Sequence, residues 1–152
     1  MTQIQKCLAE IAKQEKQFHA LYRNVGATFG LPDCAMWVLY YLAISEEEIT
    51  QQKLTELMMF PKQTINSAVT NLANKEYVEL QVIAGTRNKK KIVLTPSGTK
   101  LAQQTVSRMY NAECRAASVL GAEKMSEFLK LYSMFYESLN NEFTKEGFVD
   151  EN

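Results

Sequence analysis

The chain has 152 residues, enough for one compact domain or for one domain with helical extensions. Hydrophobic residues at 46% and charged residues at 22% are ordinary for a soluble protein, and no apolar run approaches the ~18–20 residues of a membrane-spanning helix. The formal net charge is zero, because 17 basic residues balance 17 acidic ones, so only the distribution of charge can indicate an anionic partner.

A long amphipathic helix is predicted at the N-terminus. From Ile4 to Phe29 apolar residues recur at intervals of mostly four and three. Gly30 and Pro32 are expected to end this helix, since glycine permits a left-handed cap and proline cannot continue the helix. Asp33 is expected to cap a second helix, roughly residues 34–44, which is apolar nearly all round and is therefore predicted to form the core.

The acidic run at residues 45–48 is interpreted as a solvated loop, and two short helices joined by a tight turn are predicted after it. Thr50 is expected to cap the first of them, which extends to about residue 58 with Leu54 and Leu57 pointing inward. The second helix is predicted from Pro61 to about Asn74, because proline suits the first turn of a helix. Its polar face consists of Lys62, Gln63, Thr64, Asn66, Ser67, Thr70 and Asn71.

A period of two then predicts a β-hairpin. Val78, Leu80 and Val82 alternate with polar residues, and Ile92 and Leu94 repeat the pattern in a second strand. The tip covers residues 84–91 and carries four positive charges within five residues. The polar residues singled out there are Arg87, Asn88, Lys89, Lys90 and Lys91.

Two C-terminal helices complete the predicted order. Thr95 and Pro96 are expected to start a helix that runs to about Leu120, and Gly121 is expected to separate it from a last helix. The apolar stripes of these helices and of the N-terminal helix exceed what one small lobe can cover, so we expect them to form a homodimer. The predicted organisation is a dimerisation region, residues 1–30 and 96–148, intertwined in one domain with a lobe of residues 31–95.

The charge is distributed unevenly along the chain. Residues 50–100 contain eight basic and three acidic residues, a formal charge of +5, whereas the rest of the chain carries −5. No Asp or Glu occurs from Pro61 to Lys75. A helix, a turn, a second helix and a basic hairpin follow one another as in a winged helix-turn-helix, whose second helix reads the major groove of DNA. The alternative interpretations assign no function to these features: the polar helix face is then an ordinary exposed surface, and the basic tip is a solvated turn.

The residues also resemble a known family, the multiple antibiotic resistance regulator (MarR) family. The resemblance covers nearly the whole chain and implies a homodimeric transcription regulator that a small phenolic or lipophilic ligand, or oxidation, often releases from DNA. It is carried by Leu54-x-x-Leu57, by the segment Pro61–Leu72, by Tyr77-Val78, and by Ile92-Val93-Leu94-Thr95-x-x-Gly98.

Two departures from the family pattern bear on DNA contacts. The family usually has Asp-x-Arg at the wing tip, whereas the aligned residues here are Thr86-Arg87-Asn88, followed by the lysine run. The family's recognition helix often has an arginine near its middle, where this chain has Ser67 and Thr70. The operator preference of relatives therefore does not transfer to this chain.

The sequence gives weaker evidence for an effector pocket, a metal site or a reactive cysteine. A small aromatic or lipophilic effector would need an apolar pocket, for which the candidates are Tyr22, Arg23, Met36, Trp37 and Tyr40; their alternative role is simply core packing. His19 is the only histidine, so no metal site is expected. The three cysteines, Cys7, Cys34 and Cys114, suggest buried or idle thiols, with a redox-sensing thiol as the alternative.

The sequence therefore predicts a mainly α-helical protein with a small β-hairpin wing, a winged helix-turn-helix with N- and C-terminal dimerisation helices. We expect a cytoplasmic, sequence-specific regulator that binds a palindromic operator in double-stranded DNA, a repressor relieved by a small-molecule or redox signal. No catalytic residues and no cofactor are expected, and we expect no membrane association. The alternative function is a winged-helix scaffold for protein–protein contact that does not bind DNA.

Overall fold

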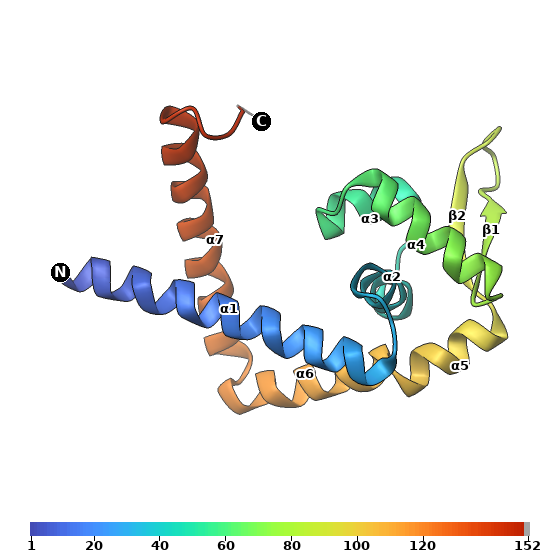
Figure 1. Cartoon of the computed structure of the whole chain (residues 1–152), viewed down its shortest axis with the longest axis horizontal. Coiled ribbons are helices and arrows are strands. Elements are labelled where there is room, and N and C mark those ends of the chain that lie inside the picture. Colours follow the sequence, from blue (N-terminus) through green and yellow to red (C-terminus); the bar gives the residue numbers. More distant parts are fainter. Residues whose placement is uncertain (151–152) are drawn as a thin grey trace. The chain divides into compact units, whose positions relative to one another are not determined.

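The computed structural model describes residues 1–150 and confirms a mainly helical fold with one antiparallel hairpin (Figure 1). The described residues form two compact units, one from Met1 to Tyr110 and one that starts at Asn111. The elements in chain order are α1 (Gln3–Phe29), α2 (Asp33–Ile44), α3 (Gln51–Met58), α4 (Lys62–Asn74), β1 (Val78–Val82), β2 (Lys90–Leu94), α5 (Pro96–Gln104), α6 (Val106–Leu120) and α7 (Ala122–Lys145).

Helix α2 is the centre of the first unit. It contacts α1, α3, α4, α5 and β2, which surround it in Figure 1. Met36, Val38 and Leu39 have no exposed surface, as expected for a helix that is apolar nearly all round. The predicted role of this helix as the core is confirmed.

The junction between α1 and α2 follows the prediction except at one residue. Gly30 adopts the left-handed conformation, with a φ of 66°, and caps the C-terminus of α1. Asp33 was expected at the N-cap of α2, but Pro32 occupies that position without any side-chain hydrogen bond. Asp33 is instead the first helical residue, where its negative charge interacts favourably with the helix dipole.

Helices α3 and α4 form the predicted helix-turn-helix. The Thr50 hydroxyl accepts a hydrogen bond from the Lys53 amide at 3.1 Å, which confirms the cap of α3. Leu54 is fully buried, but the prediction for Leu57 is wrong, because this residue is 38% exposed and lies outside the single row that α3 turns toward the core. Met59, with a φ of 55°, ends α3 in a left-handed turn. The buried residues of α4 are Ile65, Ala68, Val69 and Leu72.

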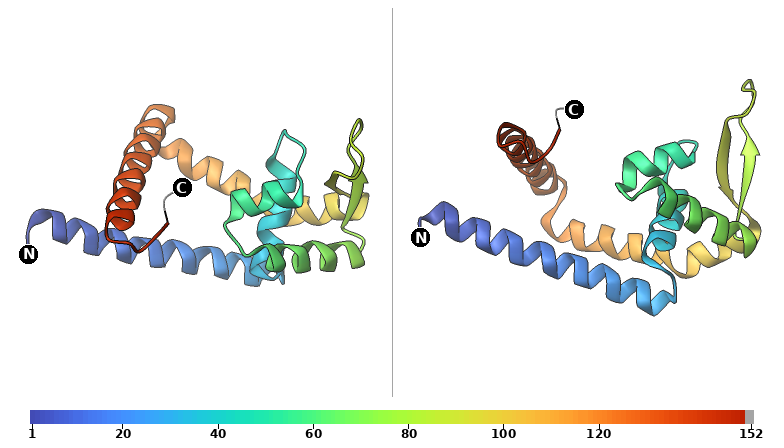
Figure 2. Two further views of the ribbon diagram at one scale, coloured as in Figure 1. Left: turned by 90° about the horizontal axis from the view of Figure 1, so that it is seen from above. Right: turned by 45° about the horizontal axis from the view of Figure 1, so that its top comes forward.

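The β1–β2 hairpin extends beyond the core. Its register pairs Val78 with Leu94 and Leu80 with Ile92. Val78 and Ile92 are buried, whereas Leu80 is exposed, so only the base of the hairpin packs inward. Both views in Figure 2 show the hairpin at one end of the first unit with its tip projecting away from the helices. The Ile92 amide also donates to the Ile49 carbonyl at 2.7 Å, which fastens β2 to the segment before α3.

A compact joint connects the hairpin to α5 and explains the Thr-x-x-Gly motif. The Thr95 hydroxyl accepts from the Gly98 amide at 3.0 Å and donates to the Glu76 carbonyl at 2.5 Å, while the Thr95 amide donates to the Tyr77 carbonyl at 3.1 Å. A Cβ atom on Gly98 would lie 1.8 Å from the Tyr77 carbonyl oxygen. Glycine is therefore required at this position by close backbone approach.

The helix predicted from residue 96 to 120 is interrupted. Thr105 has a φ of −122° and a ψ of −94°, which separates α5 from α6. Its hydroxyl donates to the Leu101 carbonyl at 2.7 Å, and its amide bonds to the Ala102 carbonyl three residues back. Such local hydrogen bonds compete with the regular helical ladder and bend or break helices. The predicted break at Gly121 is confirmed, with a φ of 84°.

The second unit consists of most of α6 together with α7. Helix α7 has no buried residue, although it carries many large apolar side chains. Within residues 1–150 no single helix is long and apolar enough to cross a membrane, and α1 and α2 meet that test only as a pair bent by 87°.

Candidate nucleic-acid interface

The polar face of α4 is exposed in the first unit. Four buried side chains hold the opposite face against the core, so the helix presents a fixed row of hydrogen-bonding groups to solvent. These groups include carboxamides and hydroxyls of the kinds that bind base edges and phosphates. The predicted contact residues that are exposed are Lys62, Gln63, Thr64, Ser67, Thr70 and Asn71.

Asn66 differs from the rest of this face. Its side chain is half-buried, and its Oδ1 atom is inaccessible to solvent without a hydrogen-bond partner among the described residues. Buried oxygen atoms without partners are uncommon and energetically costly. Asn66 therefore has less of its amide available to a base edge than Asn71, which is exposed.

The wing tip presents its basic residues unequally. Arg87, Asn88, Lys89 and Lys90 are exposed. Lys91 is only 28% exposed in its side chain, and its Nζ lies 2.6 Å from Oε1 of Glu48, in the loop before α3. Within the described part of the chain, the lysine run thus divides into two ammonium groups without a carboxylate partner, those of Lys89 and Lys90, and one, that of Lys91, with such a partner.

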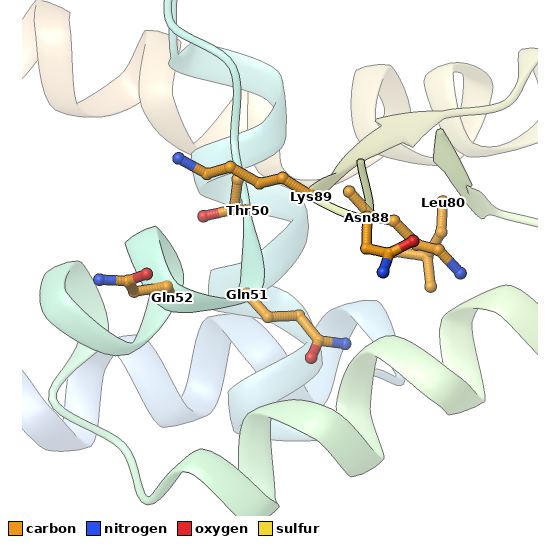
Figure 3. A pocket seen from close by; sticks show the side chains of 7 residues that line it. Thr50, Gln51, Gln52, Leu80, Asn88 and Lys89 are labelled. Carbon is orange, nitrogen blue, oxygen red and sulfur yellow. The ribbon is translucent and has the colours of Figure 1, made fainter. Parts of the chain in front are cut away.

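A pocket lies between the wing and the start of α3 (Figure 3). Its volume is about 270 Å³, and the residues that line it include no carboxylate. In Figure 3 the Lys89 side chain reaches across toward Thr50. The lining residues are Thr50, Gln51, Gln52, Leu80, Asn88, Lys89 and Lys90.

The candidate effector residues are brought together, but as a packed aromatic cluster. The rings of Tyr22 and Trp37 lie 5.2 Å apart, as do those of Trp37 and Tyr40, and Tyr110 lies 6.0 Å from Tyr40. These separations are typical of tilted and edge-to-face aromatic pairs. The cluster is half-buried, so it fits both predicted roles, core packing and the wall of an effector site.

The other two candidates stand apart from this cluster. Met36 has no exposed surface, and a Cβ atom on Gly26 would lie 3.2 Å from its sulfur, so an effector would reach Met36 only if α1 and α2 separated. Arg23 is exposed on α1. Met36 is therefore a core residue in this structure and does not line an accessible effector site.

The cysteines are in different settings. Cys34 is buried, and burial, followed by the nearby Asp33 carboxylate, raises the pKa of its thiol. A raised pKa disfavours the reactive thiolate. Cys7 and Cys114 are exposed. Among residues 1–150 no three potential ligands of the types His, Cys, Asp and Glu gather into a group that could hold a metal ion.

Sequence reasoning missed three residues that surround the basic wing. Glu48 was interpreted as part of a solvated loop, yet it pairs with Lys91, 43 positions away. Gln51 and Gln52 line the pocket beside Lys89 and Lys90. The first turn of α3 was visible from Thr50, but nothing local in the sequence indicated that the hairpin would fold back against it.

These features define the class of the protein. A core of packed helices, the α3–turn–α4 pair and an antiparallel hairpin with a basic tip form a winged helix-turn-helix. The family model that matches the chain is that of the MarR family, over residues 29–87. No curated protein matches the chain at a significant level.

Solved structures share this fold over almost the whole chain. Their sequence identities are low, so the likeness concerns the fold and not the function. A MarR family regulator from Neisseria meningitidis is 20% identical, with a TM-score of 0.75 over 96% of this chain and 99% of that one. The regulator MarR from Oenococcus oeni is 20% identical, with a TM-score of 0.67 over 87% and 98%. The MepR–DNA complex of S. aureus is 21% identical, with a TM-score of 0.62 over 91% and 99%.

The family model matches residues 29–87, and the solved structures show that the chain has the winged helix-turn-helix fold of MarR family regulators, as the sequence predicted. Among the similar structures, the one from Oenococcus oeni is named as a transcription regulator and the one from Neisseria meningitidis as a MarR family regulator.

Proposed function

We propose that this chain is a sequence-specific, double-stranded-DNA-binding transcription regulator that acts as a homodimer. The observation that carries the proposal is the pairing of a carboxylate-free, exposed polar face on α4 with a projecting, basic hairpin in the same unit. The first feature suits base edges in the major groove, and the second suits the phosphate backbone. MepR, which has the same fold, has been solved bound to DNA.

The residues of this interface have distinct proposed roles. Gln63, Ser67, Thr70 and Asn71 on α4 read bases or hold phosphates, and Lys62 lies at the start of that helix. Arg87, Lys89 and Lys90 supply the electrostatic part of the affinity, because each neutralised phosphate releases condensed counterions. Asn88 lies between them at the tip. Thr64 is exposed and is a further contact residue of this face, whereas Asn66 makes a smaller contribution because it is only partly accessible.

The dimer is supported by uncovered apolar surface. Ile4, Phe18 and Leu21 on α1 are between 59 and 73% exposed, and α7 exposes a stripe of aromatic and aliphatic side chains. A monomer rarely leaves so many large apolar groups in water. Two-fold symmetry would place two copies of α4 about 34–36 Å apart, one turn of DNA, and would require a palindromic operator. The stripe on α7 includes Phe128, Leu129, Tyr132, Phe135, Tyr136, Leu139 and Phe143.

We propose further that the chain is a repressor relieved by a signal. Tyr22, Trp37 and Tyr40 form an aromatic cluster at the junction of α1 and α2, the connection between the first helix and the DNA-reading core. A small aromatic or lipophilic molecule that inserted there would change how these helices pack. Oxidation is the second proposed signal, and the exposed Cys7 and Cys114 are better placed for it than the buried Cys34.

The test of DNA binding is a titration of a labelled 30-base-pair duplex with the full chain at 50 to 200 mM KCl, followed by fluorescence anisotropy. We expect affinity to fall steeply with salt, with a slope near −0.9 for each phosphate neutralised. Neutralising Lys89 and Lys90 together should flatten the slope and weaken binding to every sequence. A chain that shows no affinity for duplex DNA at 50 mM KCl would instead support the scaffold function.

A further inference from the structure

The acidic loop before α3 lies against the basic wing. Glu48 Oε1 is 2.6 Å from Lys91 Nζ, and Glu47 Oε2 is 3.4 Å from Lys53 Nζ on α3. At the next residue after Glu48, the Ile49 carbonyl accepts a hydrogen bond from the Ile92 amide at 2.7 Å. The backbone contact therefore holds the loop beside β2 at the position where Glu48 meets Lys91.

Strand alternation separates Lys91 from Lys90. Ile92 is buried, and Lys90 lies on its side of the strand, two residues away. Lys90 lines the pocket at the start of α3, as does Lys89. Lys91 points to the opposite side of β2, where it is 28% exposed and bonded to the loop. Among residues 1–150, Lys89 and Lys90 have no carboxylate partner and line the pocket, while Lys91 belongs to an intramolecular ion pair with Glu48.

We propose that Glu48 is a positioning residue that retains Lys91 as its counter-charge in the DNA complex, so that Lys89 and Lys90, but not Lys91, neutralise phosphates. This inference rests on the proposed DNA-binding function and refines it. Glu48 fixes the wing to the loop and also limits the affinity of the wing for DNA of any sequence. The Lys91 charge therefore neutralises no phosphate, and the affinity of the chain for non-operator DNA is lower as a result.

Single and double substitutions of Glu48 and Lys91 can test this proposal, because each changes the local charge in a different way. Removing Glu48 frees the Lys91 ammonium for a phosphate, whereas removing Lys91 leaves an uncompensated carboxylate near DNA. Removing both leaves the local charge as it is in the wild type. Each phosphate neutralised contributes about 0.9 to the slope of log K against log salt concentration, so these cases give different slopes.

The experiment compares Glu48→Gln, Lys91→Gln and the double variant with the wild type, using a labelled 30-base-pair duplex of mixed sequence in 50 to 200 mM KCl. We expect Glu48→Gln to bind about threefold or more tightly at 50 mM KCl and to steepen the slope by up to about 0.9 for each bound protomer. Lys91→Gln should weaken binding, and the double variant should return close to the wild-type slope. Lys89→Gln should flatten the slope by about 0.9 for each protomer in every background.

Glu46→Gln is the matched control. Glu46 lies in the same loop and is exposed, without an ion pair among the described residues. Its loss changes the net charge equally but frees no lysine, so its slope should remain that of the wild type. If Glu46→Gln steepens the slope as much as Glu48→Gln, general charge explains the effect and the proposal fails.

Two other results would overturn the proposal. If Lys91 leaves Glu48 to bind a phosphate, Lys91→Gln and the double variant both lose about 0.9 of slope for each protomer, and Glu48→Gln leaves it unchanged. If the pair only supports the fold, Glu48→Gln lowers the melting temperature and weakens DNA binding without steepening the slope. A wild-type chain without affinity for duplex DNA would refute the proposed function itself, which separates the two failures.

Discussion

Replacing Gly98 with alanine tests how the wing is joined to α5. The new Cβ would lie 1.8 Å from the Tyr77 carbonyl oxygen and 2.7 Å from its carbon, both backbone atoms that no side-chain rotation can move. Relief requires the backbones at Tyr77 and Gly98 to separate by more than 1 Å, taking as reference an ordinary contact distance of about 3.4 Å. That movement strains the hydrogen bond from the Thr95 amide to the same Tyr77 oxygen.

The expected cost follows from these contacts. Overpacking costs about 1–3 kcal/mol, and the loss of a buried hydrogen bond adds about 1 kcal/mol. The better helix propensity of alanine returns up to about 1 kcal/mol. A net loss of about 1–3 kcal/mol in the free energy of unfolding should lower the melting temperature by roughly 3–10 °C in a domain of this size.

The assay is thermal unfolding followed by circular dichroism at one fixed protein concentration, because dimerisation would make the melting temperature depend on concentration. Gly85→Ala is the control. Gly85 also lies in the hairpin and has a φ of 78°, but a Cβ there meets nothing within 4 Å, so only the conformational cost of about 1 kcal/mol applies. If Gly98→Ala melts within 1 °C of the wild type, close backbone approach is not what this glycine provides.

Four further predictions follow from the site and its surroundings. Asn71→Ala should change the preferred DNA sequence and cost about 1–3 kcal/mol on the operator, whereas Asn66→Ala should have a smaller effect; binding to selected and scrambled duplexes compares them. Cys34 should react with a thiol reagent far more slowly than the two exposed cysteines in the native chain, and at the same rate in denaturant. Because its pKa is raised in the folded chain, stability should fall as pH rises above the ordinary thiol range, and Cys34→Ala should remove that part of the decline, measured by denaturant unfolding. Phe135→Asp on α7 should shift sedimentation toward a monomer at micromolar concentration; an unchanged dimer would place the interface elsewhere.

The elements of the fold were largely predictable because their signals are local. Thr50 and Thr95 bond to amides three residues ahead, and Gly30 takes the left-handed conformation that only a few residues tolerate. The break at Thr105 was not predictable, because threonine occurs in uninterrupted helices and its hydroxyl bond to Leu101 becomes decisive only in the folded context. Asp33 failed as a cap because Pro32, one residue earlier, already occupies the N-cap position.

The exposed face of α4 was predictable from the sequence, but the pairings around the wing were not. The exposed face of α4 follows from helical periodicity alone, which identifies Ser67 and Asn71 as outward residues. The ion pair between Glu48 and Lys91 joins segments 43 residues apart and depends on how the hairpin folds back. The same holds for the pocket, whose walls come from α3 and from the wing. Charge counted along the sequence therefore overestimates the number of wing lysines that have no carboxylate partner among the described residues.

Selection of bound fragments from random-sequence duplex DNA tests the central claim most directly. Anisotropy titrations of the selected and scrambled duplexes at 150 mM KCl would follow the selection. We expect a palindromic sequence with half-sites about 10–10.5 base pairs apart and an affinity at least about 1,000-fold above that for scrambled DNA. If no sequence is enriched, or if selected and scrambled duplexes bind equally, this winged helix does not read DNA sequence.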